Sequence, residues 1–341
     1  MKRLSKLLLG VAAGLAMGWA LWWQVLASGQ EVAIAAWFDA RRAQGWQAEH
    51  SAVDVAGFPT RLEREIRNIA LTDPKTGWSW SAPEVAFLGE AISPTVIRVN
   101  LPESHILSLP RETVEIGHSR MQADLSLSPD PALSWRRGAI DGADLNLAAD
   151  SGWTGSARTL TAEIKARAKG SAPPNSYAIN LSATEVAIPK PLLTQIDPTG
   201  LLAPLVNQLH LTGTAALQAP LDRYALEEGR LALNAATIRQ AKLVWGDMRI
   251  EASGRIKTDL HGFASGEIDL KLRNWREMVR IARQSNTLDR RMLGAIEQAL
   301  KVASVIGGTG QDVEVTLRLN GGKVRIGPIA IGKAPKLAPP A

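Results

Sequence analysis

Residues Asp312–Asn320 read DVEVTLRLN, and much of the architecture follows from the pattern in this short segment. Apolar side chains stand at every second position, at Val313, Val315, Leu317 and Leu319. Alternation with a period of two is typical of a β-strand that turns one face to a core and the other to water. Asn320-Gly321 comes next, and this pair favours the left-handed backbone of a tight hairpin. The segment therefore predicts an antiparallel strand that turns straight back on itself.

The same alternation recurs along most of the chain. It is clearest in two further segments, Ser176–Ala183 and Gly266–Arg273. Similar runs are Asp124–Leu127, Asp144–Leu147, Leu209–Leu217, Arg230–Asn234 and Met248–Lys257. Turn-forming residues lie between such runs, at Asp73-Pro74, Ser128–Pro131, Asp141-Gly142 and Ala172–Asn175. The pattern predicts a mainly β, β-rich α+β fold, with one or more large curved antiparallel sheets that have an apolar face.

Three segments depart from this pattern and predict short helices that cover the sheet. They lie near residues 32–44, 190–208 and 274–306. Gly45 ends the first, and Pro198 and Pro204 limit the second to at most two short helices. In the third, Asn274 is the expected N-cap and a Ser285-Asn286 break predicts a helical hairpin over one end or face of the sheet.

The N-terminus carries an apolar run, Leu7–Ala27, which follows Lys2, Arg3 and Lys6 and is interrupted by Gln24. As a helix this run is about 31 Å long, which matches the hydrocarbon core of a bilayer. It is longer than the apolar core of a typical signal peptide, so it predicts an uncleaved transmembrane anchor, although cleavage after Ala27 stays an alternative. The residues expected to form this anchor are Leu7, Leu15, Trp19, Trp22 and Trp23.

The basic residues ahead of the apolar run predict the orientation of the chain, because such residues stay on the cytoplasmic side. Residues 1–30 are then a cytoplasmic tip and transmembrane anchor, and residues 31–333 are a β-rich domain in the periplasm. Residues 334–341 contain three prolines and are expected to be a flexible tail. The predicted location is the bacterial inner membrane, crossed once.

Composition and charge exclude several classes of protein. A chain with 45% hydrophobic and 21% charged residues is neither disordered throughout nor a polytopic membrane protein. Without Lys2, Arg3 and Lys6 the exported part has 36 basic and 33 acidic residues, a balance that gives no support for nucleic acid as a partner. The chain has no cysteine, so disulfides, thiolate metal ligands and cysteine nucleophiles are excluded.

Signatures of catalysis and of cofactor binding are missing as well. The chain has no nucleophile elbow, no zinc-protease motif and no glycine-rich phosphate loop. Its glycine cluster at Gly307–Gly310 follows a predicted helix and is interpreted as a helix stop. The five histidines are dispersed, so each is expected on a polar surface rather than in a metal site. These observations predict a protein that is not an enzyme and uses no cofactor or metal.

Three motifs resemble a known bacterial family when they are taken in order. They are Gly57-Phe58-Pro59-Thr60-Arg61, then Trp80-Ser81-Ala82-Pro83, and finally Gly327-Pro328 followed by Gly332, Lys333 and Pro335. Together with the N-terminal anchor they resemble the bacterial domain-of-unknown-function family numbered twenty-one twenty-five, over roughly residues 5–336. More distantly, the layout is similar to that of the AsmA-like envelope proteins. The resemblance supplies no catalytic residue.

These resemblances imply a β-rich periplasmic body. For the AsmA-like group they also imply an apolar groove that serves lipid traffic or upkeep of the outer membrane. The chain, at 341 residues, is far shorter than the bridge-like members of that group and could not span the periplasm alone.

The first motif also has a physical interpretation of its own. Gly57 permits a bend, Phe58 is extended because it precedes a proline, and Pro59 has no N–H to donate to a strand ladder. Together they predict a corner between two strands. Arg61 would then pair with a carboxylate across the strands or meet a lipid headgroup.

Two functions fit this sequence. An apolar strand face could bind or transfer a phospholipid or another envelope lipid, which requires no catalytic motif because each buried methylene group contributes roughly 0.8 kcal/mol. Alternatively, the protein is a structural or assembly component of the envelope that contacts a partner protein. The two differ in whether the apolar face is covered, and alternation alone does not determine this.

Overall fold

The computed structural model describes residues 2–168, 170, 172–227, 232–285, 289–307 and 311–338, without the side chains of residues 2–13, 94, 226–227 and 306–307. The chain divides into two compact units. Unit 1 contains Met1–Ser126 and Ala149–Ser151, and unit 2 contains Leu127–Ala148 and Gly152–Ala341. The strand pairings within each unit are antiparallel, so the predicted mainly β fold with antiparallel sheets is confirmed.

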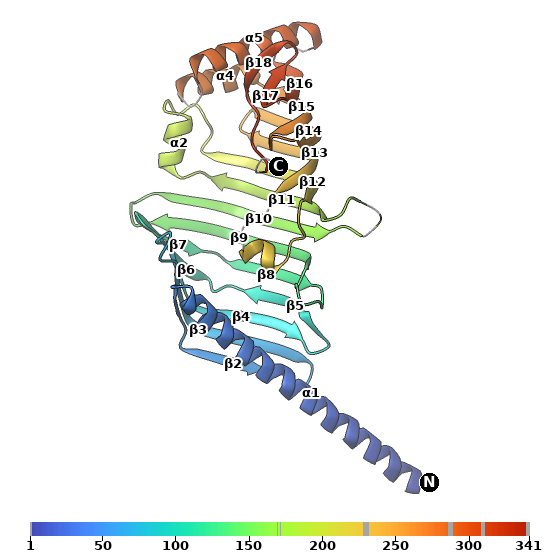
Figure 1. Ribbon diagram of the computed structural model, residues 1–341. Helices are drawn as coiled ribbons and strands as arrows, with labels where there is room; N and C mark the ends of the chain where they lie inside the picture. The colour runs from blue at the N-terminus through green and yellow to red at the C-terminus, as the bar shows by residue number, and fades with distance from the viewer. Residues whose placement is uncertain are drawn as a thin grey trace. The chain divides into compact units, whose positions relative to one another are not determined.

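Unit 1 combines one long helix with a sheet of short and medium strands (Figure 1). The helix is α1, Lys2–Ala43. The strands are β1 (Gln47–Glu49), β2 (Ala52–Ala56), β3 (Arg61–Thr72), β4 (Ser79–Glu90), β5 (Ser93–Asn100), β6 (Ser104–Leu109), β7 (Glu112–Gly117) and β8 (Arg120–Leu127). The second half of α1 packs on this sheet, where Phe38 is buried with Ile66 and Val85.

The helix expected at residues 32–44 is thus the C-terminal part of a longer one. It ends where the sequence predicts, at a glycine in the left-handed region: Gly45 has φ 89°. The N–H groups of Gly45 and Trp46 donate to the carbonyl oxygens of Arg42 and Arg41, at 2.9 and 3.0 Å, and so satisfy two of the last free carbonyls of the helix. Among the residues that the structure describes, no helix is both long enough and apolar enough to cross a membrane.

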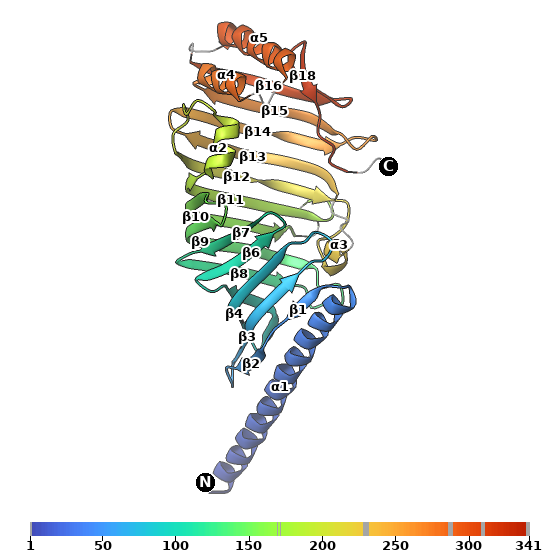
Figure 2. The ribbon, with the colours of Figure 1, turned by 90° about the vertical axis from the view of Figure 1, so that its left-hand side faces the viewer.

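Unit 2 is a sheet in which each strand pairs with the next one along the chain, as Figure 2 shows for β9 to β16. Its strands are β9 (Trp135–Ala149), β10 (Thr154–Ala166), β11 (Ser176–Ala187), β12 (Leu205–Leu217), β13 (Leu233–Trp245), β14 (Met248–Thr258), β15 (Ala264–Arg273), β16 (Asp312–Asn320), β17 (Lys323–Ile326) and β18 (Ile329–Lys333). Its helices are α2 (Lys190–Ile196), α3 (Arg223–Glu227), α4 (Trp275–Gln284) and α5 (Arg290–Gly307).

The helical hairpin expected near residues 274–306 is present as α4 and α5, and it packs on β15 and β16. Trp275 and Leu300 are buried there against Val313. The expected cap differs in detail. Asn274 occupies the N-cap position with φ 61°, but its side chain makes no capping hydrogen bond. Gly307 ends α5, whereas the rest of the predicted glycine stop, residues 308–310, lies outside the described residues.

Two expectations about unit 2 are wrong because pairing overrides the local signals. Residues 205–208, expected within a short helix, belong to β12, where Leu205 pairs with Ala187 of β11. Asp141-Gly142, expected in a turn, lies inside β9. The ladder between β9 and β10 runs through Gly142, which pairs with Leu160.

The hairpin expected after Asn320 joins β16 to β17, shifted by one residue. Asn320 is the last strand residue and pairs with Lys323. The two turn residues are Gly321 and Gly322, with φ angles of 55° and 71°. Both central residues of this turn have left-handed backbone, which two glycines adopt at no steric cost.

The tail is packed rather than flexible as far as residue 338. Ala334 and Ala338 are buried, and the N–H of Leu337 donates to the carbonyl oxygen of Gly262 at 2.8 Å. Lys336 forms an isolated bridge with Phe263. The tail thus continues the sheet of unit 2 past β18, because the alanines are small enough to fit against it. Residues 339–341 of the predicted tail lie outside the described residues.

Candidate functional site

One side of the sheet formed by β9 to β16 is apolar across three neighbouring rows of directly paired residues. The first row consists of Ile140, Ala162, Leu181, Leu211, Ala241, Ala252, Leu270 and Val315. The second row is Gly142, Leu160, Ala183, Leu209, Leu243, Ile250, Leu272 and Val313. The third is Gly138, Ile164, Ile179, Gly213, Ile238, Gly254, Ile268 and Leu317. We call these three rows the apolar face.

The opposite side of the same strands is polar, as period-two alternation requires. One row there reads Asp141, Thr161, Ser182, His210, Lys242, Glu251, Lys271 and Glu314. Charged neighbours on this side pair, with Lys271 2.9 Å from Glu314 and Arg318 3.1 Å from Glu267. The polar side therefore suits contact with water, whereas the apolar face needs a cover.

The cover is incomplete. At the β16 end, α4 and α5 lie over the apolar face, and Val315 is only 7% exposed. In the same row at the other end, Leu181 of β11 is 37% exposed and Ile140 of β9 is 44% exposed. Since these residues share one row and one face, the difference reflects the cover and not the direction of the side chains. Along this row the apolar face is thus closed over β15 and β16 and exposed at Leu181 and Ile140, which we call the open part of the face. In the second row Ala183 of β11 is buried.

Two chain segments border this face near the ends of the strands. The indole N–H of Trp245 donates to the carbonyl oxygen of Ala203 at 2.8 Å, which fastens the loop after α2 beside β13. The N–H of Leu221 donates to the hydroxyl of Tyr177 at 2.7 Å, which fastens the segment before α3 over β11. Tyr177 alternates with Ile179 and Leu181, so this second segment also lies on the side of the apolar face.

A small apolar hollow of about 230 Å³ lies between α4 and the loop after α2. Leu243 and Ile250 of the apolar face are part of its lining, as are Trp245, Met248 and Met278. It lies over β13 and β14, beside the part of the face that α4 covers. Such a lining can hold hydrocarbon and offers no hydrogen bond to select a polar group.

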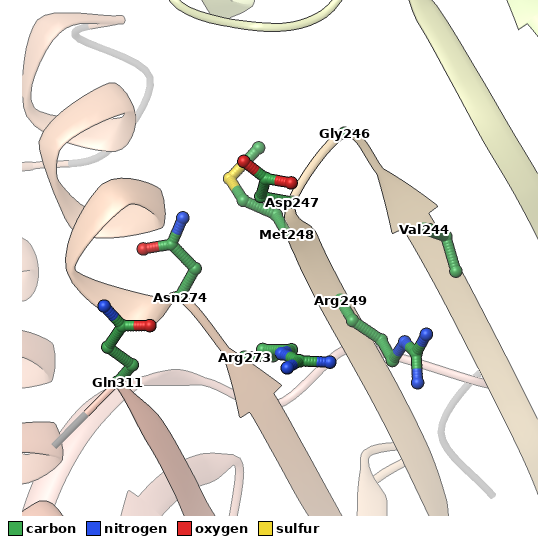
Figure 3. A pocket seen from close by; sticks show the side chains of 8 residues that line it. All are labelled: Val244, Gly246, Asp247, Met248, Arg249, Arg273, Asn274 and Gln311. Carbon is green, nitrogen blue, oxygen red and sulfur yellow. The ribbon is translucent and has the colours of Figure 1, made fainter. Parts of the chain in front are cut away.

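A polar hollow of about 460 Å³ lies at the turn between β13 and β14 (Figure 3). Arg249 and Arg273 line it and are direct register partners on β14 and β15. Like charges placed opposite each other destabilise a sheet, so this position favours an anion or a counter-charge. Arg249 lies 3.9 Å from a carboxylate oxygen of Glu251. Met248 lines both this hollow and the apolar one.

The motif Gly57–Arg61 forms the predicted corner between β2 and β3, and α1 is fastened to it. The indole N–H groups of Trp19 and Trp23 donate to the carbonyl oxygens of Pro59 and Arg61, each at 2.7 Å. The ring of Trp23 also meets that of Phe58 edge to face, with centroids 5.5 Å apart. The structure therefore joins two groups of residues that the sequence singled out separately.

The remaining predicted residues lie apart from this corner. Leu15 and Trp22 are exposed on α1, and the side chain of Leu7 lies outside the described residues. Trp80 and Pro83 are in β4. Gly327 and Pro328 form the turn between β17 and β18 and border a hollow of about 610 Å³ beside α5. Trp80 and Pro83 thus belong to unit 1, and Gly327-Pro328 belongs to unit 2.

Comparison with known proteins identifies the family of this chain. The model of a family described as "Uncharacterized protein conserved in bacteria (DUF2125)" matches residues 23–335. The chain belongs to this family. No curated protein matches it. The DUF2125 match begins at Trp23, inside α1, and includes the Gly57–Arg61 corner and the apolar face. The more distant likeness to AsmA-like proteins stays a prediction.

The DUF2125 chain also contains a histidine pair that its sequence did not predict. His105 of β6 and His118, between β7 and β8, are buried, with ring centroids 5.7 Å apart, and Trp80 packs on His105 at 5.9 Å. Burial lowers the pKa of both, and the neighbouring His118 lowers that of His105 further. The expected polar-surface position is wrong for these two. In the described part of the chain, no three metal-ligating side chains come together.

Proposed function

We propose that this DUF2125 protein binds the acyl chain of a membrane lipid on the open part of its apolar face and is not an enzyme. The observation that supports this is the row from Val315 to Ile140, in which exposure rises from 7% under α4 and α5 to 44% at β9. An apolar surface of this size costs free energy in water, and a bound hydrocarbon chain removes that cost.

The magnitude is favourable for a lipid. Each methylene group moved from water to an apolar surface contributes roughly 0.8 kcal/mol, so even a partly covered acyl chain binds well. The face presents side chains of leucine, isoleucine and alanine, which contact hydrocarbon and do not discriminate between headgroups. Specificity for the polar end would come from elsewhere, and Arg249 and Arg273 lie beside the apolar hollow with Met248 between the two sites.

The location proposed for this activity is the periplasmic side of the bacterial inner membrane. The support comes from the sequence, namely the uncharged run Leu7–Ala27 behind three basic residues. A protein held at the membrane surface takes lipid from that membrane or returns lipid to it, as expected for a carrier in envelope maintenance.

Native mass spectrometry of the full-length protein, extracted in detergent, tests the proposal. We expect phospholipid to remain bound to the wild type. Leu181→Glu places a carboxylate on the open apolar face, and we expect it to lower lipid occupancy about tenfold or more, because each 1.4 kcal/mol of desolvation cost is a factor of ten.

Ser182→Glu is the matched control, since Ser182 is the next residue of β11 and faces the polar side. It should retain the lipid of the wild type. Equal occupancy in the two variants would contradict binding at this face. Absence of lipid together with a protein partner on the wild type would favour the structural or assembly role instead.

A further inference from the structure

One end of unit 1 exposes large apolar side chains on two adjoining turns. Phe58, in the corner between β2 and β3, is 56% exposed, and Ile92, in the turn between β4 and β5, is 73% exposed. The turns are held together, because the N–H of Ala91 donates to the carbonyl oxygen of Thr60 at 2.9 Å. The two side chains thus belong to one edge of the sheet. The ring of Phe58 packs on Trp23 and still leaves more than half of its surface exposed.

This edge is fixed at a definite level along α1. Trp19 and Trp23 donate to the carbonyl oxygens of Pro59 and Arg61, so the corner lies beside the part of the helix between these two indoles. Each bond joins residues about 40 positions apart in the chain, at separations of 40 and 38. These two hydrogen bonds hold this part of α1 on the sheet of unit 1.

The same stretch of α1 carries no charge. Between Lys6 and Glu31 the chain has no acidic or basic residue. Leu15, Leu21 and Val25 are all largely exposed on it. The corner therefore lies next to an uncharged part of the helix that exposes apolar side chains, and Trp23 of this part packs on Phe58.

Arg61 supplies a positive group at the same place. Its side chain is exposed, and its guanidinium lies a long 3.5 Å from a carboxylate oxygen of Glu63. A guanidinium so loosely paired can form two hydrogen bonds with a phosphate. This edge combines exposed aromatic and aliphatic side chains with an exposed arginine. Such a combination suits the boundary between hydrocarbon and lipid headgroups.

We propose that this edge, formed by Phe58, Ile92 and Arg61, rests on a lipid bilayer. Phe58 and Ile92 enter the layer between headgroups and acyl chains, and Arg61 binds a lipid phosphate. A bilayer fits better than a protein partner because it covers the exposed apolar side of α1 and the two turns at once. The inference rests on the proposed membrane attachment of α1 and adds that the folded sheet of unit 1 touches the membrane.

The chain has no cysteine, so single cysteines report on single positions. We would label Ile92→Cys and Phe58→Cys with an environment-sensitive fluorophore in the full chain, reconstituted into vesicles of phosphatidylcholine and phosphatidylglycerol. Quenchers are lipids with a nitroxide at a shallow or a deep position of the acyl chain. Leu15→Cys reports on the helix, and Leu260→Cys, exposed in the turn between β14 and β15, is the control in unit 2.

We expect shallow nitroxides to remove most of the fluorescence at positions 58 and 92, and to leave position 260 unchanged. Quenching at position 15 without quenching at 58 and 92 would overturn the inference while the proposed attachment stands. No quenching at position 15 would overturn both. Ile92→Cys keeps the test valid if loss of the Phe58 ring disturbs its contact with Trp23.

The role of Arg61 is tested in the Ile92→Cys background. Adding Arg61→Gln should weaken the shallow quenching more in vesicles with phosphatidylglycerol than in phosphatidylcholine alone, because the guanidinium is attracted to anionic lipid. An equal effect in the two kinds of vesicle would show that Arg61 does not contact lipid phosphate.

Discussion

His105 and His118 form a buried pair whose ring nitrogens lack partners: Nδ1 of both residues and Nε2 of His118 make no hydrogen bond within the described chain. Neutral imidazoles tolerate such a site, whereas imidazolium ions do not. The folded-state pKa values of both lie below the value of about 6.5 expected in the unfolded chain. As the pH falls below that value, the unfolded chain takes up protons first, and the folded state loses stability.

We therefore expect the melting temperature of the protein to fall as the pH is lowered from neutral to acidic values. The double variant His105→Leu, His118→Leu should show a smaller fall, measured by differential scanning calorimetry across the same buffers. Carboxylates contribute a pH dependence of their own, so the comparison of the two slopes is the test. Identical slopes would show that the two imidazoles take up protons as readily in the folded state as in the unfolded chain, so that burial does not lower their pKa.

The contact between α1 and the Gly57–Arg61 corner depends on two indole N–H groups. Trp23→Phe keeps an aromatic ring against Phe58 but removes the donor to Arg61, and Trp19→Phe removes the donor to Pro59. Each lost hydrogen bond costs about 0.5–1.5 kcal/mol. Trp22→Phe is the matched control, since Trp22 lies on the same helix with an exposed side chain.

Hydrogen exchange measures the result. In the Trp19→Phe, Trp23→Phe double variant we expect faster exchange in β3 next to the corner, together with a lower melting temperature. Trp22→Phe should exchange like the wild type. If the two kinds of variant behave alike, the indole bonds do not hold α1 on the sheet.

Elements that carry a local sequence pattern were predictable from the sequence. Features that depend on contacts with distant parts of the chain were not. Period-two alternation predicts β11, β15 and β16, since each strand carries its own signal. The pattern misplaces Asp141-Gly142, because a turn-forming pair is tolerated inside β9 once β10 pairs alongside. His105 and His118 meet only through the folding of β6 and β7, and no spacing in the sequence indicates that.

The candidate site divides in the same way. Alternation predicts that an apolar face exists, and in the structure the apolar sides of β9 to β16 join into rows. Of the strand predicted at Arg230–Asn234, residues 230 and 231 lie outside the described residues, and β13 begins at Leu233. Whether the face is covered depends on where α4 and α5 pack. Their packing on β16, the strand that follows them in the sequence, is a tertiary contact that alternation does not predict. The sequence-based description of α4 and α5 as a cover over one end was right. Leu181 and Ile140 lie on β11 and β9, away from β14, β16 and β18, with which these helices make most of their contacts.

For the whole molecule, an open apolar face means that stability depends on what occupies it. A ligand that binds only the folded state stabilises it by about 2.7 kcal/mol at a hundredfold excess over its dissociation constant. For a folding unit of about 150–250 residues, the size range of unit 2, each kcal/mol raises the melting temperature by about 2–4 °C, so saturating lipid should raise that of unit 2 by about 5–11 °C. We would exchange the delipidated full-length protein into amphipol and add phosphatidylglycerol.

Leu181→Glu and Ser182→Glu are used in this experiment as well, because they distinguish lipid binding on the apolar face from lipid binding elsewhere on the protein. The wild type and Ser182→Glu should show the full rise, and Leu181→Glu should show little, because its carboxylate blocks the open part of the face. A rise of equal size in all three would mean that lipid stabilises the protein elsewhere, for example along α1. No rise in the wild type would leave the exposed row from Leu181 to Ile140 without a lipid ligand, and a protein partner would then be the better explanation for its exposure.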